Sequence, residues 1–284
     1  MLFRSNADPT VTTGFGREWS TFTQNISSLE KAERERLFAE YFRIFPWSEL
    51  PANAEGLDAG CGSGRWAFLV APRVGRLHVL DASREALEVA KANLAEQGNV
   101  AFHYASVSEI PLADNSLDFA YSLGVLHHVP DTVAAIRHIG SKLKPDTPFL
   151  IYLYYALDNR PAWFRAIWQI TNVARMAIAR LPARLKLFVS ELIAATVYWP
   201  IARLCAAFSK LGLSTRLIPL EAYKDRSFYT MRTDAYDRFC TSLEQRFSRK
   251  QIAEMLEQAG FDRIVFSEEV PFWCAVARKR SATE

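Results

Sequence analysis

The stretch Leu57-Asp58-Ala59-Gly60-Cys61-Gly62-Ser63-Gly64 decides the fold that this sequence predicts. A short strand over 56–59 runs into three glycines at alternate positions, and a helix is expected to follow. Glycine leaves the backbone bare, so such a turn brings main-chain atoms and helix N–H groups against a ligand. The turn alone is weak evidence, because the same pattern also makes a plain tight turn between a strand and a helix.

The spacing of the glycines narrows the kind of ligand. The nicotinamide-binding fingerprint separates its last two glycines by three residues, whereas Gly62 and Gly64 are two apart. This spacing disfavours a nicotinamide cofactor. Asp81 follows at the end of the second predicted strand, about 20 residues on, where a carboxylate can accept hydrogen bonds from both hydroxyls of a ribose.

Beyond the loop, short apolar runs alternate with amphipathic helical stretches, which predicts an α/β fold with a parallel sheet. A helix over 29–45 comes first, and later helices begin after the caps Ser83, Asp131 and Ser248 and extend to Gln97, Leu143 and Ala259. The predicted strands are 56–59, 77–81, 100–104, 117–122, 149–154, 263–268 and 272–277.

With these motifs in order, the chain resembles the class I S-adenosylmethionine (SAM) dependent methyltransferases over about 55–153 and the last two strands. Besides the glycine loop, the matching segments are Leu80-Asp81-Ala82-Ser83, Ile110 to Asp118, Leu123 to Val129, and Leu143-Lys144-Pro145. The resemblance implies a Rossmann-like, doubly wound, mostly parallel seven-stranded sheet with a helical insert after the fifth strand.

The resemblance also implies a SAM site. The glycine loop would hold the methionine half, Asp81 the ribose, and the segment at Ser106 and Val107 the adenine. The expected cofactor residues are Asp58, Gly60, Cys61, Gly62, Gly64, Asp81, Ala82, Ser106, Val107 and Leu123. Many family members carry Asp where this chain has Ser106, and the segment 144–148 lacks the usual glycine pair, which affects a turn.

Methyl transfer of this kind is an in-line displacement at a sulfonium methyl group, and orientation contributes most to it. Alignment can remove roughly 7–11 kcal/mol of barrier, whereas a positioned base adds about 10²–10⁴-fold, so no metal is expected. His127 and His128 follow the fourth strand and are the candidate catalytic residues, with His127 preferred as the base. The alternative is that His128 only caps or packs the next helix.

Two segments are candidates for binding the acceptor. Phe15 and Trp19 belong to an N-terminal arm that either closes over the cofactor or anchors in the core. The stretch 223–234 lacks regular periodicity and is expected to be a loop, in which Tyr223, Arg226, Tyr229 and Arg232 bind an anionic or sugar-bearing acceptor or lie on a solvated surface.

Between the two parts of the predicted sheet, residues 160–216 carry nine basic residues and one acid, Glu191. Two or three helices are expected, broken at Pro182 and Pro200. The longest charge-free run, 192–202, is shorter than the 20 or so residues that span a bilayer. The insert is predicted to be a lid over the acceptor site. A dimer surface and a face resting on anionic lipid are the alternatives.

The predicted organisation is an N-terminal arm and helix (1–48), a SAM-binding core (49–157), the insert with the substrate loop (158–247) and a C-terminal helix with strands (248–284). Four scattered cysteines and no secretory signal predict a cytoplasmic protein that can associate with the inner membrane face. The expected function is methylation of an O or N atom on a small or carrier-linked acceptor: a glycan, glycolipid or natural product, and not nucleic acid. The alternatives are a non-catalytic SAM-binding scaffold and, ranked lower, RNA methylation or other chemistry on the same fold.

Overall fold

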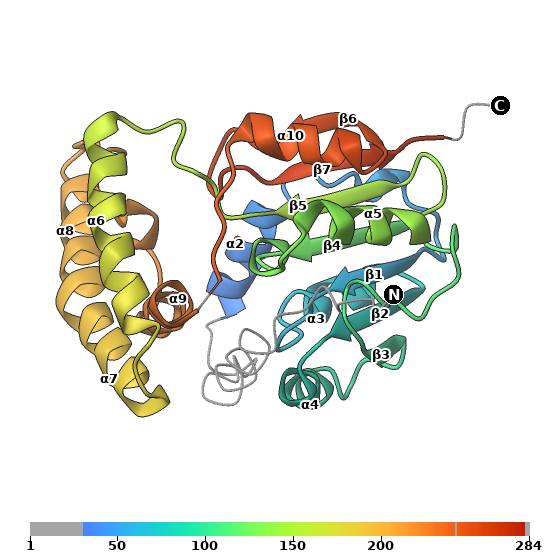
Figure 1. Ribbon diagram of the computed structural model, residues 1–284, viewed down its shortest axis with the longest axis horizontal. Coiled ribbons are helices and arrows are strands. Elements are labelled where there is room, and N and C mark those ends of the chain that lie inside the picture. Colours follow the sequence, from blue (N-terminus) through green and yellow to red (C-terminus); the bar gives the residue numbers. More distant parts are fainter. Residues whose placement is uncertain (1–30, 242, 282–284) are drawn as a thin grey trace. The chain divides into compact units, whose positions relative to one another are not determined.

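The computed structural model describes residues 31–241 and 243–281 (Figure 1). These residues belong to two compact units. The first contains 34–156 and 243–281, and the second contains 31–33 and 157–241.

The first unit is built on one seven-stranded sheet with the strand order β3-β2-β1-β4-β5-β7-β6. The strands are β1 (Glu55–Ala59), β2 (Arg76–Asp81), β3 (Val100–Tyr104), β4 (Phe119–Leu123), β5 (Pro148–Tyr152), β6 (Phe261–Phe266) and β7 (Ala275–Lys279). The first five are parallel, and β7 runs antiparallel to both β5 and β6. The predicted Rossmann-like, mostly parallel fold is therefore confirmed. Because the strand order reverses between β1 and β4, a ligand is expected at their carboxyl ends.

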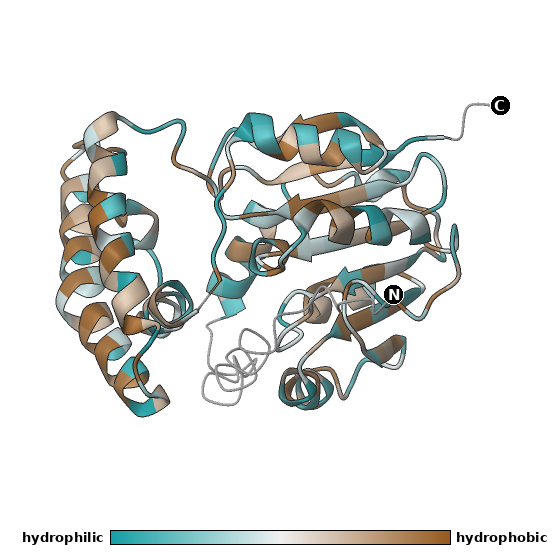
Figure 2. Cartoon of the chain, in the orientation of Figure 1, coloured by the Kyte–Doolittle hydropathy of each residue, from teal (hydrophilic) through white to brown (hydrophobic). Residues whose placement is uncertain are grey.

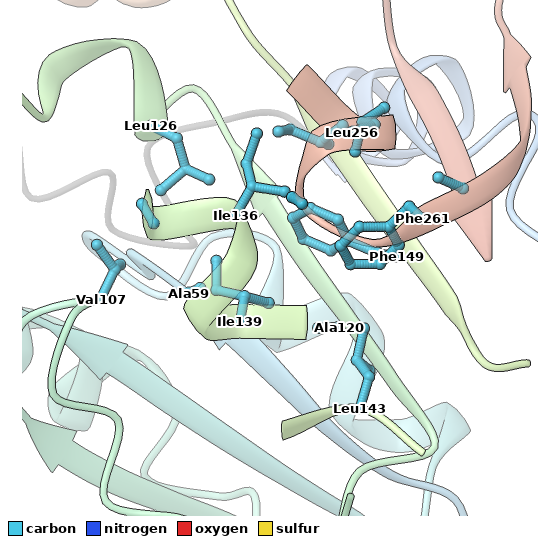
Figure 3. Packing of buried hydrophobic residues seen from close by; sticks show 14 of the residues in the cluster. Ala59, Val107, Ala120, Leu126, Ile136, Ile139, Leu143, Phe149, Leu256 and Phe261 are labelled. Carbon is cyan, nitrogen blue, oxygen red and sulfur yellow. The ribbon is translucent and has the colours of Figure 1, made fainter. Parts of the chain in front are cut away.

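The two faces of the sheet bury separate apolar clusters. One cluster joins the sheet to α5 (Thr132–Lys142) and α10 (Arg249–Gln258), as Figure 3 shows for Ile136, Phe149 and Leu256. The other joins it to α2 (Lys31–Tyr41), α3 (Ala67–Val70) and α4 (Arg84–Asn93). Short 3₁₀ turns lie at Trp47–Glu49, Ala71–Arg73 and Leu126–His128. Along β4, β5 and β7 side chains alternate between the two clusters, which is why these strands read as short continuous apolar runs.

All three predicted helix caps are present. The side chains of Ser83, Asp131 and Ser248 accept hydrogen bonds from backbone N–H groups in the first turns of α4, α5 and α10. The ends of several elements differ from the prediction by up to four residues. Leu153, Phe272 and Trp273 are apolar and pack in the core but lie outside the strands, so apolar character extended the predicted strands beyond their hydrogen-bonded ladders.

The second unit is helical. Its elements are α6 (Ala162–Ile178), α7 (Ala183–Ile193), a π-helical segment (Ala194–Tyr198), α8 (Trp199–Lys210), a 3₁₀ turn (Glu221–Tyr223) and α9 (Phe228–Cys240). The prediction of a break at Pro200 is wrong, because α7, the π segment and α8 form one continuous helix. Pro200 lies in the first turn of α8, directly after the π segment, and wider π turns accommodate a residue that lacks an N–H group.

This continuous helix, Ala183–Lys210, also corrects the expectation that the insert holds no stretch long enough to span a bilayer. Its 28 residues make it, within the described part of the chain, the one helix that is long and apolar enough to cross a membrane by length and composition. Only 22% of its most apolar 18-residue window is buried. The charge-free run 192–202 is shorter than this helix because Arg203 ends the run but not the helix.

The predicted loop over 223–234 is largely helical, so that prediction is wrong from Ser227 onward. Ser227 caps α9 by accepting a hydrogen bond from the Thr230 N–H group at 3.3 Å. The buried side of α9 contains Thr230, Met231, Thr233 and Tyr236. Because several of these residues are polar, the sequence lacks the apolar three- and four-residue spacing by which most amphipathic helices are recognised.

Candidate functional site

The glycine loop follows β1, at the edge of the sheet where the strand order reverses, and its three glycines have left-handed backbone conformations. Gly60, Gly62 and Gly64 all have positive φ, at 87°, 53° and 76°. A Cβ on Gly60 would lie 2.4 Å from a side-chain carbon of Val125, and one on Gly64 would lie 2.9 Å from Leu94. Two of the glycines are therefore required by close packing as well as by backbone conformation.

The N–H groups of this loop are used within the protein. Gly60 and Cys61 donate to the Leu80 carbonyl at 2.8 and 3.0 Å, and Gly62 donates to Asp81 Oδ2 at 2.9 Å. A dinucleotide loop directs such donors at a pyrophosphate. Here they tie the loop to the end of β2, and α3 beyond the loop has only four residues. This geometry fits a cofactor that carries no phosphate, and SAM carries none.

Asp81 is held at the carboxyl end of β2 with both oxygens engaged by the backbone. Oδ1 accepts from the Ser83 N–H group at 2.8 Å, and Oδ2 accepts from Gly62. Burial raises the pKa of Asp81 above its usual value, while these backbone hydrogen bonds oppose that rise. Each carboxylate oxygen accepts about two hydrogen bonds, so capacity remains for the two hydroxyls of a ribose.

Asp58 is buried in β1 directly before the loop. The Tyr121 hydroxyl donates to Asp58 Oδ2 at 2.9 Å, and burial raises the pKa of Asp58 to about 8. A cation that approaches a buried carboxyl group stabilises its ionised form and lowers its pKa. The methionine half of SAM carries an ammonium group and a sulfonium group, so a carboxyl group in this position fits that half.

Two side chains that the sequence did not single out support the loop. Asn93 of α4 donates to the Ser63 carbonyl at 2.9 Å, and the Ser122 hydroxyl of β4 donates to the Ala59 carbonyl at 2.8 Å. Ser122 is a polar residue in an otherwise apolar strand, which is a weak signal, and Asn93 has no comparable signal in its surrounding sequence. Neither Asn93 nor Ser122 marks a site by residue type alone.

The segment predicted to hold adenine follows β3, and the Ala105 N–H group donates to the Asp81 carbonyl at 3.2 Å. Val107 is buried, whereas Ser106 is partly exposed and its hydroxyl lies 3.0 Å from that of Ser108. Ser106 is therefore engaged locally, where many relatives of this fold carry a carboxylate. Ala82 lies between Asp81 and Ser83 in the bend after β2, and Cys61 is buried within the loop.

Leu123 ends β4, and Gly124 turns away from the sheet with a φ of 79°. The 3₁₀ turn that follows buries both candidate catalytic histidines. His128 Nδ1 lies 2.6 Å from the Leu243 carbonyl, so Nδ1 carries the proton and donates it there. That bond fixes His128 to the segment before α10, which agrees with a packing role for this residue.

His127 is fully buried between His128 and Tyr154, with ring centroids 4.0 and 3.9 Å away. Burial lowers the pKa of His127 well below its usual value, and His128 and Arg246 add to the effect. Among the described residues, neither ring nitrogen of His127 has a hydrogen-bond partner. A buried imidazole without partners is costly to the fold and marks a candidate functional group.

None of the described residues that are predicted to bind the acceptor belongs to the first unit. Tyr223, Arg226, Tyr229 and Arg232 lie in the second unit, and Phe15 and Trp19 lie outside the described residues. Within the second unit, the Tyr223 hydroxyl donates to Asp234 at 2.9 Å, and Arg232 pairs with Glu191. Their assignment to an acceptor stays a prediction, as does that of the insert as a lid.

The described residues contain no group of three or more His, Cys, Asp or Glu side chains that could hold a metal ion. All four cysteines are buried, and none forms a disulfide.

Comparison with known proteins agrees with this geometry. Residues 57–146 match a family model described as a methyltransferase domain. An uncharacterized methyltransferase of Bacillus subtilis, YcgJ, is 32% identical over 130 residues, which covers 44% of this chain and 51% of that protein. A demethylmenaquinone methyltransferase of Staphylococcus aureus is 33% identical over 96 residues, 33% of this chain and 40% of that protein. The chain thus spans about half or less of the length of these relatives.

A SAM-dependent methyltransferase from Methanosarcina mazei superposes with a TM-score of 0.50 at 16% identity, covering 84% of this chain and 99% of the other. At that identity the structural similarity shows a shared fold and does not show a shared function. The family-model match runs from the glycine loop through the strand ends to the turn before β5. Residues 57–146 of this chain are therefore similar in sequence to a methyltransferase domain, and the solved structure supports the Rossmann-like fold.

Proposed function

We propose that the whole chain is a SAM-dependent methyltransferase that transfers a methyl group to an O or N atom of a small or carrier-linked acceptor: a glycan, glycolipid or natural product. The observation that carries the proposal is the presence of two carboxyl groups, those of Asp81 and Asp58, at the edge of the sheet where the strand order reverses. Asp81 is presented by backbone donors for a ribose, and Asp58 is buried beside the same loop, where burial raises its pKa to about 8.

When bound, SAM supplies an electrophilic methyl group on a sulfonium ion. The protein's own contribution is to position this donor and its acceptor and to exclude water. The packed glycines and the bonds from Asn93 and Ser122 make the loop rigid. The strand ends then carry His127 to the same edge of the sheet, where a neutral imidazole can accept a proton from an acceptor hydroxyl or amine.

Binding is tested first. Isothermal titration with SAM and S-adenosylhomocysteine is expected to show binding by the intact chain and at least a tenfold loss in Asp81→Asn, because one amide cannot replace a carboxylate that accepts two hydroxyls. Glu88→Gln is the matched control, since Glu88 is an exposed carboxylate on α4 paired with Lys91. Equal affinities for the Asp81→Asn variant and the control would contradict the proposed ribose contact.

Turnover is tested separately by following S-adenosylhomocysteine production with a panel of acceptors. The panel holds glycans, glycolipids and natural-product alcohols and amines, and it adds demethylmenaquinone because one relative carries that name. Methylation of a member identifies the acceptor class. Tight SAM binding without turnover on any member would favour the non-catalytic scaffold.

A further inference from the structure

Large exposed apolar side chains gather in the insert. Of those that are exposed among the described residues, all but Tyr104 and Val265 lie within 163–217. Ile170 is 71% exposed and Phe188 is 64% exposed. Figure 2 shows the same helices, α6 and α7–α8, with long hydrophobic stretches. An apolar surface of this extent marks an interaction site and not ordinary solvated protein.

The exposed residues form stripes along the helices. Trp163, Ile167 and Ile170 recur at four- and three-residue spacing on α6. Leu185, Phe188 and Leu192 recur at three- and four-residue spacing on α7, and Trp199 is exposed at the start of α8. Because residues at these spacings share one side of a helix, each helix presents a continuous apolar side to its surroundings.

The fully buried residues of α6 and α7 are polar, whereas the π segment and α8 bury Ala194, Tyr198, Ala202 and Cys205. Arg175 is buried, and its guanidinium donates to Asn172 Oδ1 and to the Thr241 carbonyl, each at 2.8 Å. Ser190 and Thr233 are also buried, and their hydroxyls donate to carbonyls one helical turn back. α6 and α7 therefore bury polar groups and expose large apolar side chains, the reverse of a helix that faces water.

The charge of the insert indicates what covers this surface. Its nine basic residues are opposed by one acid, and Arg165, Arg180, Arg184 and Lys210 are exposed. A second copy of the chain would bring two strongly positive surfaces together, which opposes self-association there. Helices that carry exposed apolar stripes together with exposed Lys and Arg side chains instead match a bilayer whose headgroups are anionic.

One side of the helix pair is already occupied by protein. Within the second unit, α9 packs against α6, α7 and the π segment, and it carries Arg232, Asp237 and Arg238. Charged side chains in the hydrocarbon interior are costly, so the unit cannot be surrounded by lipid. We propose that the insert lies on the surface of an anionic phospholipid bilayer, with the apolar stripes of α6 and α7–α8 in the headgroup and outer acyl region and the exposed arginines and Lys210 on the phosphates.

The test is flotation of the full chain with unilamellar vesicles. Vesicles of phosphatidylglycerol and phosphatidylcholine in equal parts are expected to bind the chain at low salt, and pure phosphatidylcholine is expected to bind it at least tenfold less. The triple variant Ile170→Ser, Phe188→Ser, Leu192→Ser should lose at least tenfold in partitioning. The triple variant Arg165→Gln, Arg184→Gln, Lys210→Gln should lose the preference for anionic vesicles. This binding requires no SAM and no acceptor, so its failure leaves the proposed methyl transfer unaffected.

Val265→Ser with Lys250→Gln is the matched control, because it removes one exposed apolar and one exposed basic side chain from the first unit. Circular dichroism establishes that each variant is folded. No flotation of the folded chain with anionic vesicles would overturn the proposal. So would a dimer that the triple Ser variant abolishes without vesicle binding, or resistance to alkaline carbonate extraction, which would indicate a spanning helix.

Depth is measured with brominated lipids, which quench tryptophan within the acyl region. Trp163 and Trp199 are 48% and 40% exposed on the proposed contact surface. Quenching is expected on binding and should fall by more than half in the double variant Trp163→Phe, Trp199→Phe. Quenching that is unchanged in that variant would show that another part of the chain enters the lipid, which contradicts the proposed surface.

Discussion

The protonation of the Asp58 carboxyl group makes the stability of the protein depend on pH. Its pKa of about 8 means that it is mostly protonated at neutral pH. The unfolded carboxyl titrates near 3.8, so its stabilising contribution is complete below that value and is lost as pH rises through about 8. We expect Asp58→Asn, which keeps an acceptor for Tyr121, to be more stable than the parent above pH 8. Urea unfolding across pH measures this, and parallel curves for the two proteins would contradict it.

The same carboxyl group should release a proton when a cation binds next to it. Titration of SAM at pH 7 in buffers of different ionisation enthalpy should show release of up to about one proton per SAM molecule. Asp58→Asn should release none, while Glu88→Gln should behave as the parent. A buffer-independent enthalpy for the parent would place the cationic half of SAM away from Asp58.

His127 allows a test that separates chemistry from folding. Its depressed pKa makes the neutral ring's stabilising contribution complete above about pH 6.5, and that contribution is lost as the pH falls toward the folded pKa. His127→Phe keeps an aromatic ring against Tyr154 and removes this titration, so its stability should decline less in acid. If the ring is the base, its single-turnover rate falls about 10²–10⁴-fold. His138→Gln on α5 is the control, and a parental rate in His127→Phe would exclude base catalysis.

At the scale of elements, the loop between β1 and α3 depends on glycine for packing. Gly64→Ala places a methyl group at positive φ and within 3.3 Å of both Leu94 and Ala90. We expect a loss of about 1–3 kcal/mol in the free energy of unfolding and weaker SAM binding. Gly98→Ala, which meets no atom within 4 Å, is the control. Chemical denaturation compares them, and equal stability would show that the turn is not constrained.

At the scale of the whole molecule, the two ends of the insert lie side by side in the first unit. The Ala156 and Phe247 N–H groups donate to the Phe247 and Tyr154 carbonyls, each at 2.9 Å. A short Gly/Ser linker in place of 158–241 can therefore close the gap at small entropic cost. We expect the shortened chain to fold and to bind SAM within about threefold of the parent.

Calorimetry and circular dichroism measure this outcome, with two linker lengths to separate strain from a real dependence on the insert. Loss of folding with both linkers would show that the first unit requires the second. The shortened chain should also lose flotation with anionic vesicles, which assigns any lipid binding to the insert.

Much of the first unit could be predicted from sequence because local chemistry specifies it. The alternating runs predicted the parallel sheet, Ser83, Asp131 and Ser248 marked three helix starts, and the glycine spacing with Asp81 indicated the cofactor class. These signals are local, since a cap or a positive-φ turn involves residues close together in the chain.

Tertiary structure alone decided the rest, because it depends on what a side chain meets far along the chain. The buried state of Asp58 and His127, the support from Asn93 and Ser122, and the use of loop N–H groups by Leu80 and Asp81 arise from neighbours in other elements. In the insert, apolar periodicity predicted helices, but it could not say which side faces inward. The buried Arg175 and the exposed Ile170 reverse the usual pattern, and only packing reveals that reversal.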